Sequence, residues 1–269
     1  MQLLFVFVLL ILECNMKPVT LIAFGCSNTK GTESIVDYDE GINDTSLNHD
    51  TAYPKYLADV LGYAYENYAE NGVSNQEISS KVFEITDTRK TNIFVVIGWT
   101  DDNRIAISKD PQKSSFTKTS NCCTINSSLV AAHIKHRLGH SLTPRERDNI
   151  NYTRNIPFET IAGLSEHIFS TQGFCDTNFF IKYATTLHLE RYKIPFLTLP
   201  TIYTPYDVKY NYLHRKYNIT NHDENGQIVF NMLDMYKQYG ISSSGVHLKA
   251  NAHKQLAYFL HDYVRKYKC

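Results

Sequence analysis

A serine and a histidine, far apart in the chain, have the chemistry of a nucleophile and its base. Ser27 follows an apolar run in LIAFGCSNTKG, and His247 lies in SSSGVHLKANAHKQLA near the other end of the sequence. A serine hydroxyl needs a base to attack near neutral pH, and a neutral imidazole can take its proton and later return it to a leaving group. The pair therefore predicts acyl transfer through a covalent intermediate on Ser27, with His247 as the base.

Acyl transfer also requires hydrogen-bond donors aimed at the oxygen that becomes negative. Gly72, in ENGVSNQEI, offers a backbone N–H that no side chain blocks. Ser27 is itself a second candidate donor. Two further candidates lie in VVIGWTDDNR: Thr100, with one rotatable hydroxyl, and Asn103, with a side-chain amide.

Each of these residues also has an ordinary structural interpretation. Ser27 and Asn28 could cap a turn or helix, which for a serine taken alone is the commoner role. Gly72 could serve only to allow a positive φ angle, and His247 could be a structural histidine. Cys26 is an alternative nucleophile, but nothing near it in the sequence marks an activated thiol. The catalytic interpretation depends on the four segments meeting at one place.

The elements that would position these segments alternate between strands and helices. Three short runs are apolar on both faces, as parallel strands between helices are: Val19–Phe24, Asn92–Ile97 and Phe196–Leu199. Ala64–Ala69 is a further strand candidate. Apolar spacing and end signals predict helices over 53–61, 75–88 and 252–267, and one or two helices over 159–191 with an interruption near Gly173.

This order predicts an α/β fold: a doubly wound, mainly parallel sheet with helices on both faces, in three layers. In such folds ligands bind beyond the carboxyl ends of the strands. Ser27, Gly72 and Thr100 each follow a predicted strand, and His247 lies in the loop before the last helix. The four segments are thus expected to meet on one rim.

Two stretches depart from the alternation. Residues 101–155 are rich in Lys, Ser, Thr and Asn, which predicts a long loop or insertion over one end of the sheet. Leu3–Leu12 is too short an apolar run to span a bilayer, and it is closer to a signal-peptide core, although no positive residues precede it. We expect residues 1–15 to be signal-like or dispensable, Met16 to be an alternative start, and 16–269 to form a single domain.

Composition limits the partners and cofactors. The 27 Lys and Arg balance the 27 Asp and Glu, so no electrostatic footprint for nucleic acid is present, and a small or uncharged substrate fits better. Six cysteines without CxxC spacing predict neither a disulfide framework nor a zinc site. His133, His136 and His140 in AAHIKHRLGH could place metal ligands on one helix face, but a solvated, partly basic helix is the preferred interpretation. We expect no metal, no cofactor and no stable membrane insertion, and oligomeric state stays open.

The four segments resemble, in order, the four sequence blocks of the SGNH, or GDSL, hydrolases. FGCSNT is similar to the first block with Ser27 as nucleophile, and ENGVSNQEI to the second with Gly72 as the oxyanion glycine. VVIGWTDDNR is similar to the third block, GxND, and SSSGVHLKANAHKQLA to the last, DxxH, with His247 as base. The resemblance spans nearly the whole chain and implies an SGNH-like serine hydrolase without a cofactor.

Within the blocks, the chain departs from the family pattern. Cys26 stands where aspartate is usual, Thr100 replaces the oxyanion asparagine, and Ser244 stands in place of the aspartate that orients the histidine. Loss of that carboxylate can cost about four orders of magnitude in turnover, and less when a backbone carbonyl holds the tautomer. Loss of one oxyanion donor costs roughly 10² to 10³ in rate.

Two functions follow from the resemblance. The first is an esterase acting on a small ester or an acetylated glycan through a Ser27 acyl-enzyme. The second is a catalytically degenerate domain that binds a glycan or acts as a virion or cell-surface interaction module. The chain also resembles divergent SGNH-like proteins of large phages and other large DNA viruses, which favours Met16 as the start. A start at Met16 would imply a cytoplasmic or virion-associated protein, and a functional signal in 1–15 a secreted one.

Overall fold

Four parallel strands form the central sheet of the computed structural model. The structure describes residues 18–35, 46–100, 104–108, 122–125, 127–152, 159, 171–201, 235, 238–240 and 247–267. The sheet has the order β2-β1-β3-β6, and all its pairings are parallel. Its strands are β1 (Thr20–Gly25), β2 (Ala64–Asn67), β3 (Ile93–Trp99) and β6 (Phe196–Pro200).

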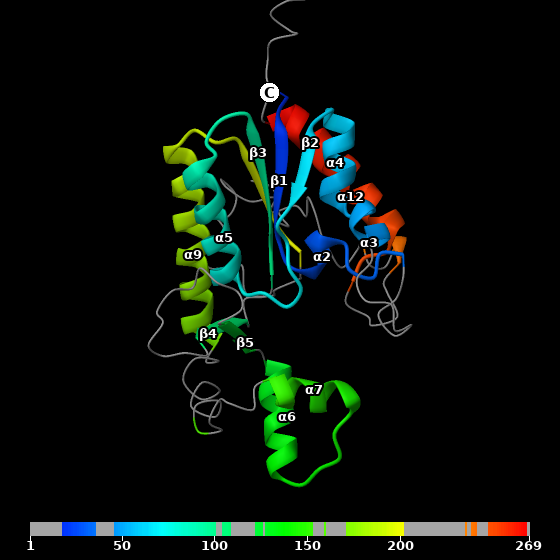
Figure 1. Ribbon diagram of the computed structural model, residues 1–269, viewed down its shortest axis with the longest axis vertical. Coiled ribbons are helices and arrows are strands. Elements are labelled where there is room, and N and C mark those ends of the chain that lie inside the picture. Colours follow the sequence, from blue (N-terminus) through cyan, green and yellow to red (C-terminus); the bar gives the residue numbers. More distant parts are fainter. Residues whose placement is uncertain are drawn as a thin grey trace, which may run out of the picture.

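Helices cover both faces of this sheet. On one face, Leu21 and Val96 pack under α4 (Tyr53–Leu61) and α12 (Ala250–Tyr267). On the other, Ile22 and Val95 pack under α5 (Asn75–Thr88) and α9 (Thr171–Arg191). Figure 1 shows the sheet edge-on between the two helix pairs. The prediction of a doubly wound, parallel, three-layer α/β fold is confirmed.

Local sequence explains where two helices begin and end. Helix α4 has Pro54 in its first turn and ends at Gly62, whose φ of 69° suits glycine. Helix α5 begins with a capping box, in which the Ser74 side chain accepts from the Glu77 N–H and the Glu77 carboxylate accepts from the Ser74 N–H. Both helices have the predicted bounds.

Other predictions were less accurate. Strand β2 ends at Asn67, two residues before the predicted end, where the Asn67 side chain accepts a hydrogen bond from the Ala69 N–H (2.9 Å). Helix α9 runs through Gly173, so the predicted interruption there is wrong. Helix α12 begins two residues earlier than predicted.

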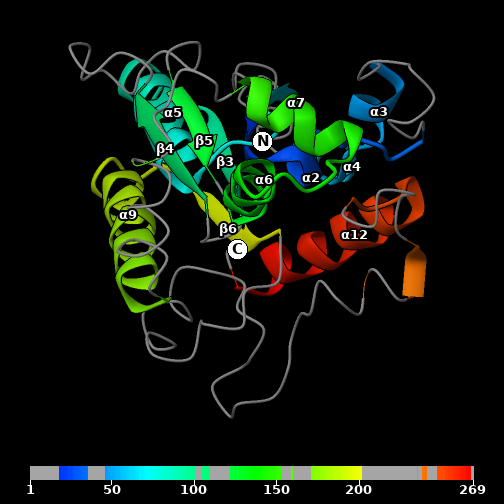
Figure 2. The ribbon, with the colours of Figure 1, turned by 90° about the horizontal axis from the view of Figure 1, so that it is seen from below.

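Part of the stretch 101–155 has regular structure. Strands β4 (Ile105–Ser108) and β5 (Cys122–Ile125) pair antiparallel, and α6 (Ser127–Arg137) and α7 (Pro144–Tyr152) follow. Figures 1 and 2 show α6 and α7 beyond the carboxyl end of the sheet. Lys135 and Glu146 join the two helices by an ion pair of 2.6 Å. His133 and His136 lie on α6, and the described residues contain no cluster of side chains suited to a metal ion.

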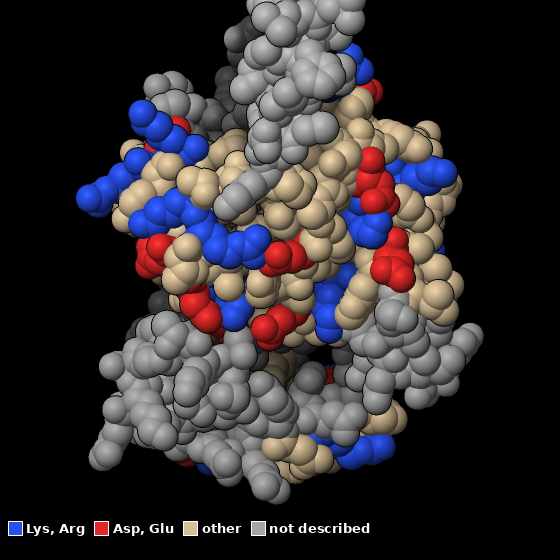
Figure 3. Space-filling view, turned by 45° about the horizontal axis from the view of Figure 1, so that its top comes forward, with Lys and Arg blue, Asp and Glu red and all other residues tan. Residues whose placement is uncertain are grey.

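Short α2 (Ser27–Lys30) and α3 (Ser46–Asp50) lie between β1 and α4. On the face that Figure 3 shows, basic and acidic side chains of the described residues are interspersed rather than gathered by sign. None of the described helices combines the length and the apolar character needed to cross a membrane.

Candidate active site at the carboxyl ends of the strands

Ser27 is the first residue of α2, in a strand–turn–helix that begins at the end of β1. Cys26 precedes it with an extended backbone (φ −93°, ψ −164°), and the Ser27 side chain is largely buried. The turn needs glycine at its start: a Cβ on Gly25 would collide with the Thr29 side chain and lie 2.7 Å from the Gly98 carbonyl oxygen. Close packing of the β1 and β3 ends therefore fixes the point at which Ser27 leaves the sheet.

Asn28 ties this turn to two distant segments. Its amide nitrogen donates to the Thr201 carbonyl just past β6 (3.2 Å), and its amide oxygen accepts from the Leu248 N–H (3.2 Å). Asn28 is fully buried, so both bonds are shielded from water. Since Asn28 is next to Ser27 and Leu248 is next to His247, the segments that carry the predicted nucleophile and base lie side by side.

A second pair of contacts joins the same segments. The Glu33 carboxylate meets the His247 imidazole (Oε2···Nδ1 2.5 Å), and the Ala250 N–H donates to the Ser34 carbonyl (2.9 Å). The prediction placed Ser244 where a carboxylate would orient His247, and residue 244 lies outside the described residues. The carboxylate found beside His247 comes from the turn after Ser27 instead.

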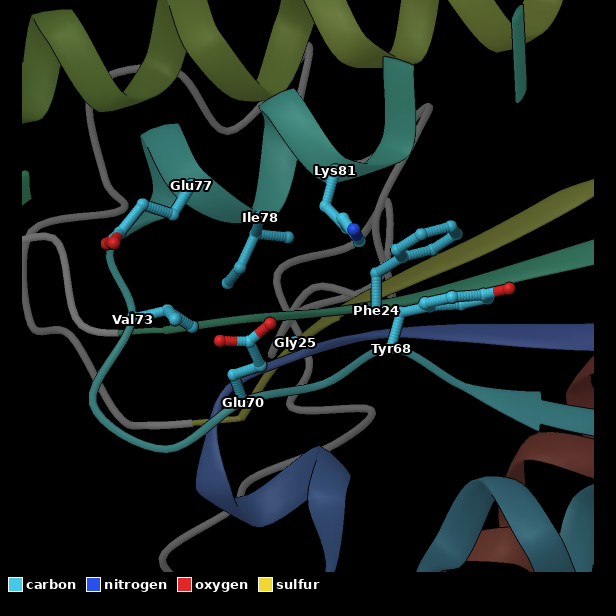
Figure 4. Close-up of a pocket in the computed structure, with 8 residues that line it drawn as sticks. All are labelled: Phe24, Gly25, Tyr68, Glu70, Val73, Glu77, Ile78 and Lys81. Atoms are coloured by element: carbon cyan, nitrogen blue, oxygen red, sulfur yellow. The ribbon is translucent and has the colours of Figure 1, made fainter. Parts of the chain in front are cut away.

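The loop that carries Gly72 lies against the Ser27 turn. The Thr32 hydroxyl donates to the Asn71 side chain (2.6 Å), and the Glu70 N–H donates to the Gly25 carbonyl (3.0 Å). Figure 4 shows the chain passing Gly25 on its way from Tyr68 to Val73. Gly72 has a φ of 75°, and a Cβ there would meet nothing, so its need for glycine is conformational.

Thr100, the residue after β3, is buried, and the Asn75 side chain holds its backbone in place. Its N–H donates to the Asn75 side-chain oxygen (2.9 Å), and its carbonyl accepts from the Asn75 amide nitrogen (3.3 Å). The Thr100 hydroxyl has no hydrogen-bond partner within the described part of the chain. An unpaired buried hydroxyl is costly, and its position at a strand end suits a group that a ligand satisfies. Asn103, the other predicted donor of this segment, lies outside the described residues.

Cys26 is no competitor for Ser27 in this structure. It is fully buried, and its Sγ lies 3.2 Å from the Thr201 hydroxyl, which in turn donates to the Trp99 carbonyl (2.8 Å). The thiol thus has a structural environment without access to solvent.

His253 lies close to the site but is structural. Its Nδ1 accepts from the Tyr53 N–H (3.2 Å), and its ring stacks on Tyr53 at 6.1 Å between centroids. Burial, with a smaller contribution from the charge of nearby His247, lowers the pKa of His253 to about 3. His253 therefore stays neutral at physiological pH.

A pocket near the site lies on its α5 side. Figure 4 shows it between α5 and the ends of β1 and β2. Its walls are mainly apolar, and neither Ser27 nor His247 lines it. The pocket is formed by Phe24, Gly25, Tyr68, Glu70, Val73, Glu77, Ile78 and Lys81.

Three residues that hold this site together carry no catalytic signal in the sequence: Glu33, Asn28 and Asn75. The sequence predicts Asn28 only as a cap and Asn75 only as the start of a helix. Glu33 follows Ser27 by six residues, and no spacing in the sequence relates it to His247. Its one signal, a carboxylate in a turn otherwise built of small residues, is visible only after the fold is known.

Comparison of the sequence with protein-family models gives no match, and comparison with curated proteins gives none either. Solved structures of similar fold include a lipolytic protein of the G-D-S-L family from Desulfitobacterium hafniense DCB-2 (12% identity, TM-score 0.43), with 91% of this chain and 98% of that one covered. Another is the psychrotrophic esterase EstA from Pseudoalteromonas sp. (10% identity, TM-score 0.43; 93% and 98% covered). A family two carbohydrate esterase from Clostridium thermocellum is similar at 12% identity and a TM-score of 0.35, with 93% of this chain and 65% of that one covered. At these identities and TM-scores, the likeness supports no conclusion about the activity of this chain.

Proposed function

We propose that this chain is an SGNH-like serine hydrolase that cleaves an ester through an acyl-enzyme on Ser27. The observation that carries the proposal is the hydrogen bond from the Leu248 N–H to the Asn28 side chain. It joins the segment of Ser27 to the segment of His247, and the proposed reaction requires these two residues to be close together. The order of the four sequence blocks supports the same reaction class.

In the proposed reaction, His247 takes the Ser27 proton as Oγ attacks the ester carbonyl carbon, and the carbonyl oxygen becomes an oxyanion. Collapse of this intermediate expels the alcohol, which receives the proton from His247. Water then attacks the carbonyl carbon of the acyl-enzyme while His247 takes a proton from the water. Collapse of this second intermediate releases the acid, and His247 returns the proton to Ser27 Oγ.

Donors for the oxyanion are proposed from three segments. The backbone N–H of Gly72 and of Ser27 and the hydroxyl of Thr100 are the described candidates, and Asn103 remains a predicted one. The unpaired, buried Thr100 hydroxyl supports its inclusion, since the oxyanion would supply the missing acceptor. The fixed backbone of Thr100 means that only its hydroxyl rotor must adjust.

The substrate class proposed is a small ester, with the O-acetyl ester of a carbohydrate as its specific form. A short acyl group suits a site whose nucleophile is largely buried at the carboxyl end of the sheet, because a buried hydroxyl leaves little room for a long chain. The glycan part of this proposal comes from the sequence resemblance, as does the proposal of a viral or phage origin.

Labelling by a fluorophosphonate probe tests the proposal. Wild type should be labelled covalently, and Ser27→Ala and His247→Ala should lose labelling by at least about 10³-fold, because each removes one half of the nucleophile–base pair. Turnover of a short aryl acetate should fall in parallel. Ser79→Ala is the matched control: Ser79 is also buried, but it bonds Thr185 between α5 and α9, and its loss should leave labelling unchanged.

A binding module without catalysis is the second candidate, favoured by the replacement of the family asparagine by Thr100. Folded wild-type protein that resists the probe and leaves aryl acetate intact would support this candidate and overturn the hydrolase. A glycan array would then be the next measurement.

A further inference from the structure

Glu33 makes a contact that the family pattern does not contain. Its carboxylate lies 2.5 Å from Nδ1 of His247, and only 4% of the Glu33 side chain and 14% of the His247 side chain are exposed. Hydrogen bonds to charged groups are stronger than neutral ones, and exclusion of water strengthens them further. The contact is therefore suited to holding the imidazole in one orientation.

The backbone of Glu33 is also unusual. Its φ is 59°, in the left-handed region that residues other than Gly, Asn and Asp seldom adopt. The turn is anchored on the nucleophile itself, because the N–H groups of Gly31 and Thr32 both donate to the Ser27 carbonyl (3.0 Å each). Unfavourable backbone geometry of this kind persists where the surroundings enforce it, and it is frequent at functional sites.

The contact with Glu33 determines which ring nitrogen of a neutral His247 carries the proton. An ionised carboxylate has acceptors but no donor, so Nδ1 must carry the proton that forms the hydrogen bond. The lone pair of the neutral ring is then on Nε2, the atom that a general base uses toward a serine.

We infer that Glu33 is a positioning residue for the proposed hydrolysis, supplying from the turn after Ser27 the carboxylate that the family places before the histidine. It fixes the Nδ1–H tautomer of His247 and stabilises the imidazolium that forms when Nε2 takes the Ser27 proton. The inference rests on the proposed function. Because Ser244 stands in place of the family's aspartate, the sequence predicts a serine–histidine pair without an orienting carboxylate; with Glu33 the site becomes a Ser27–His247–Glu33 triad.

The kinetic test compares Glu33→Gln and Glu33→Asp with wild type. Glu33→Gln keeps the shape but presents a neutral amide, and we expect the rate of fluorophosphonate labelling to fall roughly 10³- to 10⁴-fold. Glu33→Asp retains a carboxylate and should keep a larger share of the rate. In a His247→Ala background, Glu33→Gln should cost little more, because a residue that acts through His247 has nothing left to position. Glu66→Gln, which breaks an equally short pair with Arg89 elsewhere on the sheet, is the control and should not change labelling.

A second readout is independent of activity. Nitrogen-15 NMR of the His247 ring, recorded on wild type and on Ser27→Ala, should show the neutral ring with its proton on Nδ1, and Glu33→Gln should move that proton to Nε2. A wild-type ring protonated on Nε2, or labelling of Glu33→Gln at the wild-type rate, would overturn the inference. If Glu33→Gln fails to fold, the inference is still tested by the tautomer of His247 in the wild-type NMR spectrum and by the labelling rate of Glu33→Asp.

The two proposals fail in different ways. Wild type that is folded but inert to probe and ester overturns the hydrolase and, with it, a catalytic use of Glu33, whatever the tautomer. Wild type that is labelled at Ser27 while Glu33→Gln is equally reactive leaves the hydrolase intact and removes Glu33 alone.

Discussion

In the proposed reaction the Thr100 hydroxyl would be useful for chemistry although it is unfavourable for stability. Its hydroxyl is buried without a partner among the described residues, while its backbone is fully engaged by Asn75. A buried hydroxyl that bonds nothing in the resting protein is ready to donate when an acceptor with negative charge arrives. The two properties can be separated by removing the hydroxyl while keeping the shape.

We predict that Thr100→Val lowers the rate of Ser27 acylation by about 10²-fold without lowering stability. Valine matches threonine in shape and removes an unsatisfied polar group, so the free energy of unfolding should stay level or rise. Probe labelling and urea denaturation measure the two effects. A parallel loss of rate and stability would assign Thr100 a packing role, and Thr86→Val, which removes a hydroxyl bonded to the Val82 carbonyl, is the comparison in which stability should fall.

At the scale of elements, one buried amide joins three of them. Asn28 on α2 binds the carbonyl after β6 and the N–H that leads into α12. Replacing it by a residue of similar size without polar atoms would leave both partners buried and unpaired.

We predict that Asn28→Leu destabilises the protein by about 2–5 kcal/mol, since each orphaned buried group costs about 1–3 kcal/mol. Chemical denaturation measures the loss. Asn28→Asp keeps an acceptor for the Leu248 N–H, but in this fully buried position it places an unpaired carboxylate beside the Thr201 carbonyl, so at neutral pH it should cost at least as much. An Asn28→Leu variant as stable as wild type would show that the two Asn28 bonds contribute nothing.

For the whole molecule, His253 makes stability depend on pH. Its pKa of about 3 in the folded protein lies below the ordinary value of about 6.5 for an unfolded chain. Between pH ~6.5 and pH ~3 the unfolded state therefore binds a proton that the folded state does not bind. The free energy of unfolding has its full value above pH ~6.5 and falls as the pH drops toward 3.

Between pH 8 and pH 4.5 this single group should remove about 2–3 kcal/mol from the free energy of unfolding. Denaturant titrations across that range measure the slope. His253→Asn, whose amide oxygen can still accept from the Tyr53 N–H, should flatten the curve; an unchanged slope would assign the acid sensitivity to other groups.

The sequence predicted the fold from signals that are local. Doubly apolar runs marked β1, β3 and β6, Pro54 and Gly62 marked the ends of α4, and the spacing of Ile78, Val82 and Ile85 marked α5. It also predicted which strand ends carry Ser27 and Thr100. It could not predict the Glu33 contact, because a pairing across 214 positions leaves no trace in spacing. The partly basic helix preferred for AAHIKHRLGH corresponds to α6, whereas the polar composition of α7 is also typical of a loop, and the sequence does not predict that helix.

The Asn28–Leu248 bond spans 220 positions, and it bears on how the protein is made. Ribosomes synthesise the N-terminus first, at about 5–20 residues per second. The segment around Leu248 is therefore made roughly ten seconds or more after Ser27. During that interval the sheet face that α12 covers is exposed. Under the proposed function Ser27 then lacks its base, so activity would begin only when the segment that carries His247 docks.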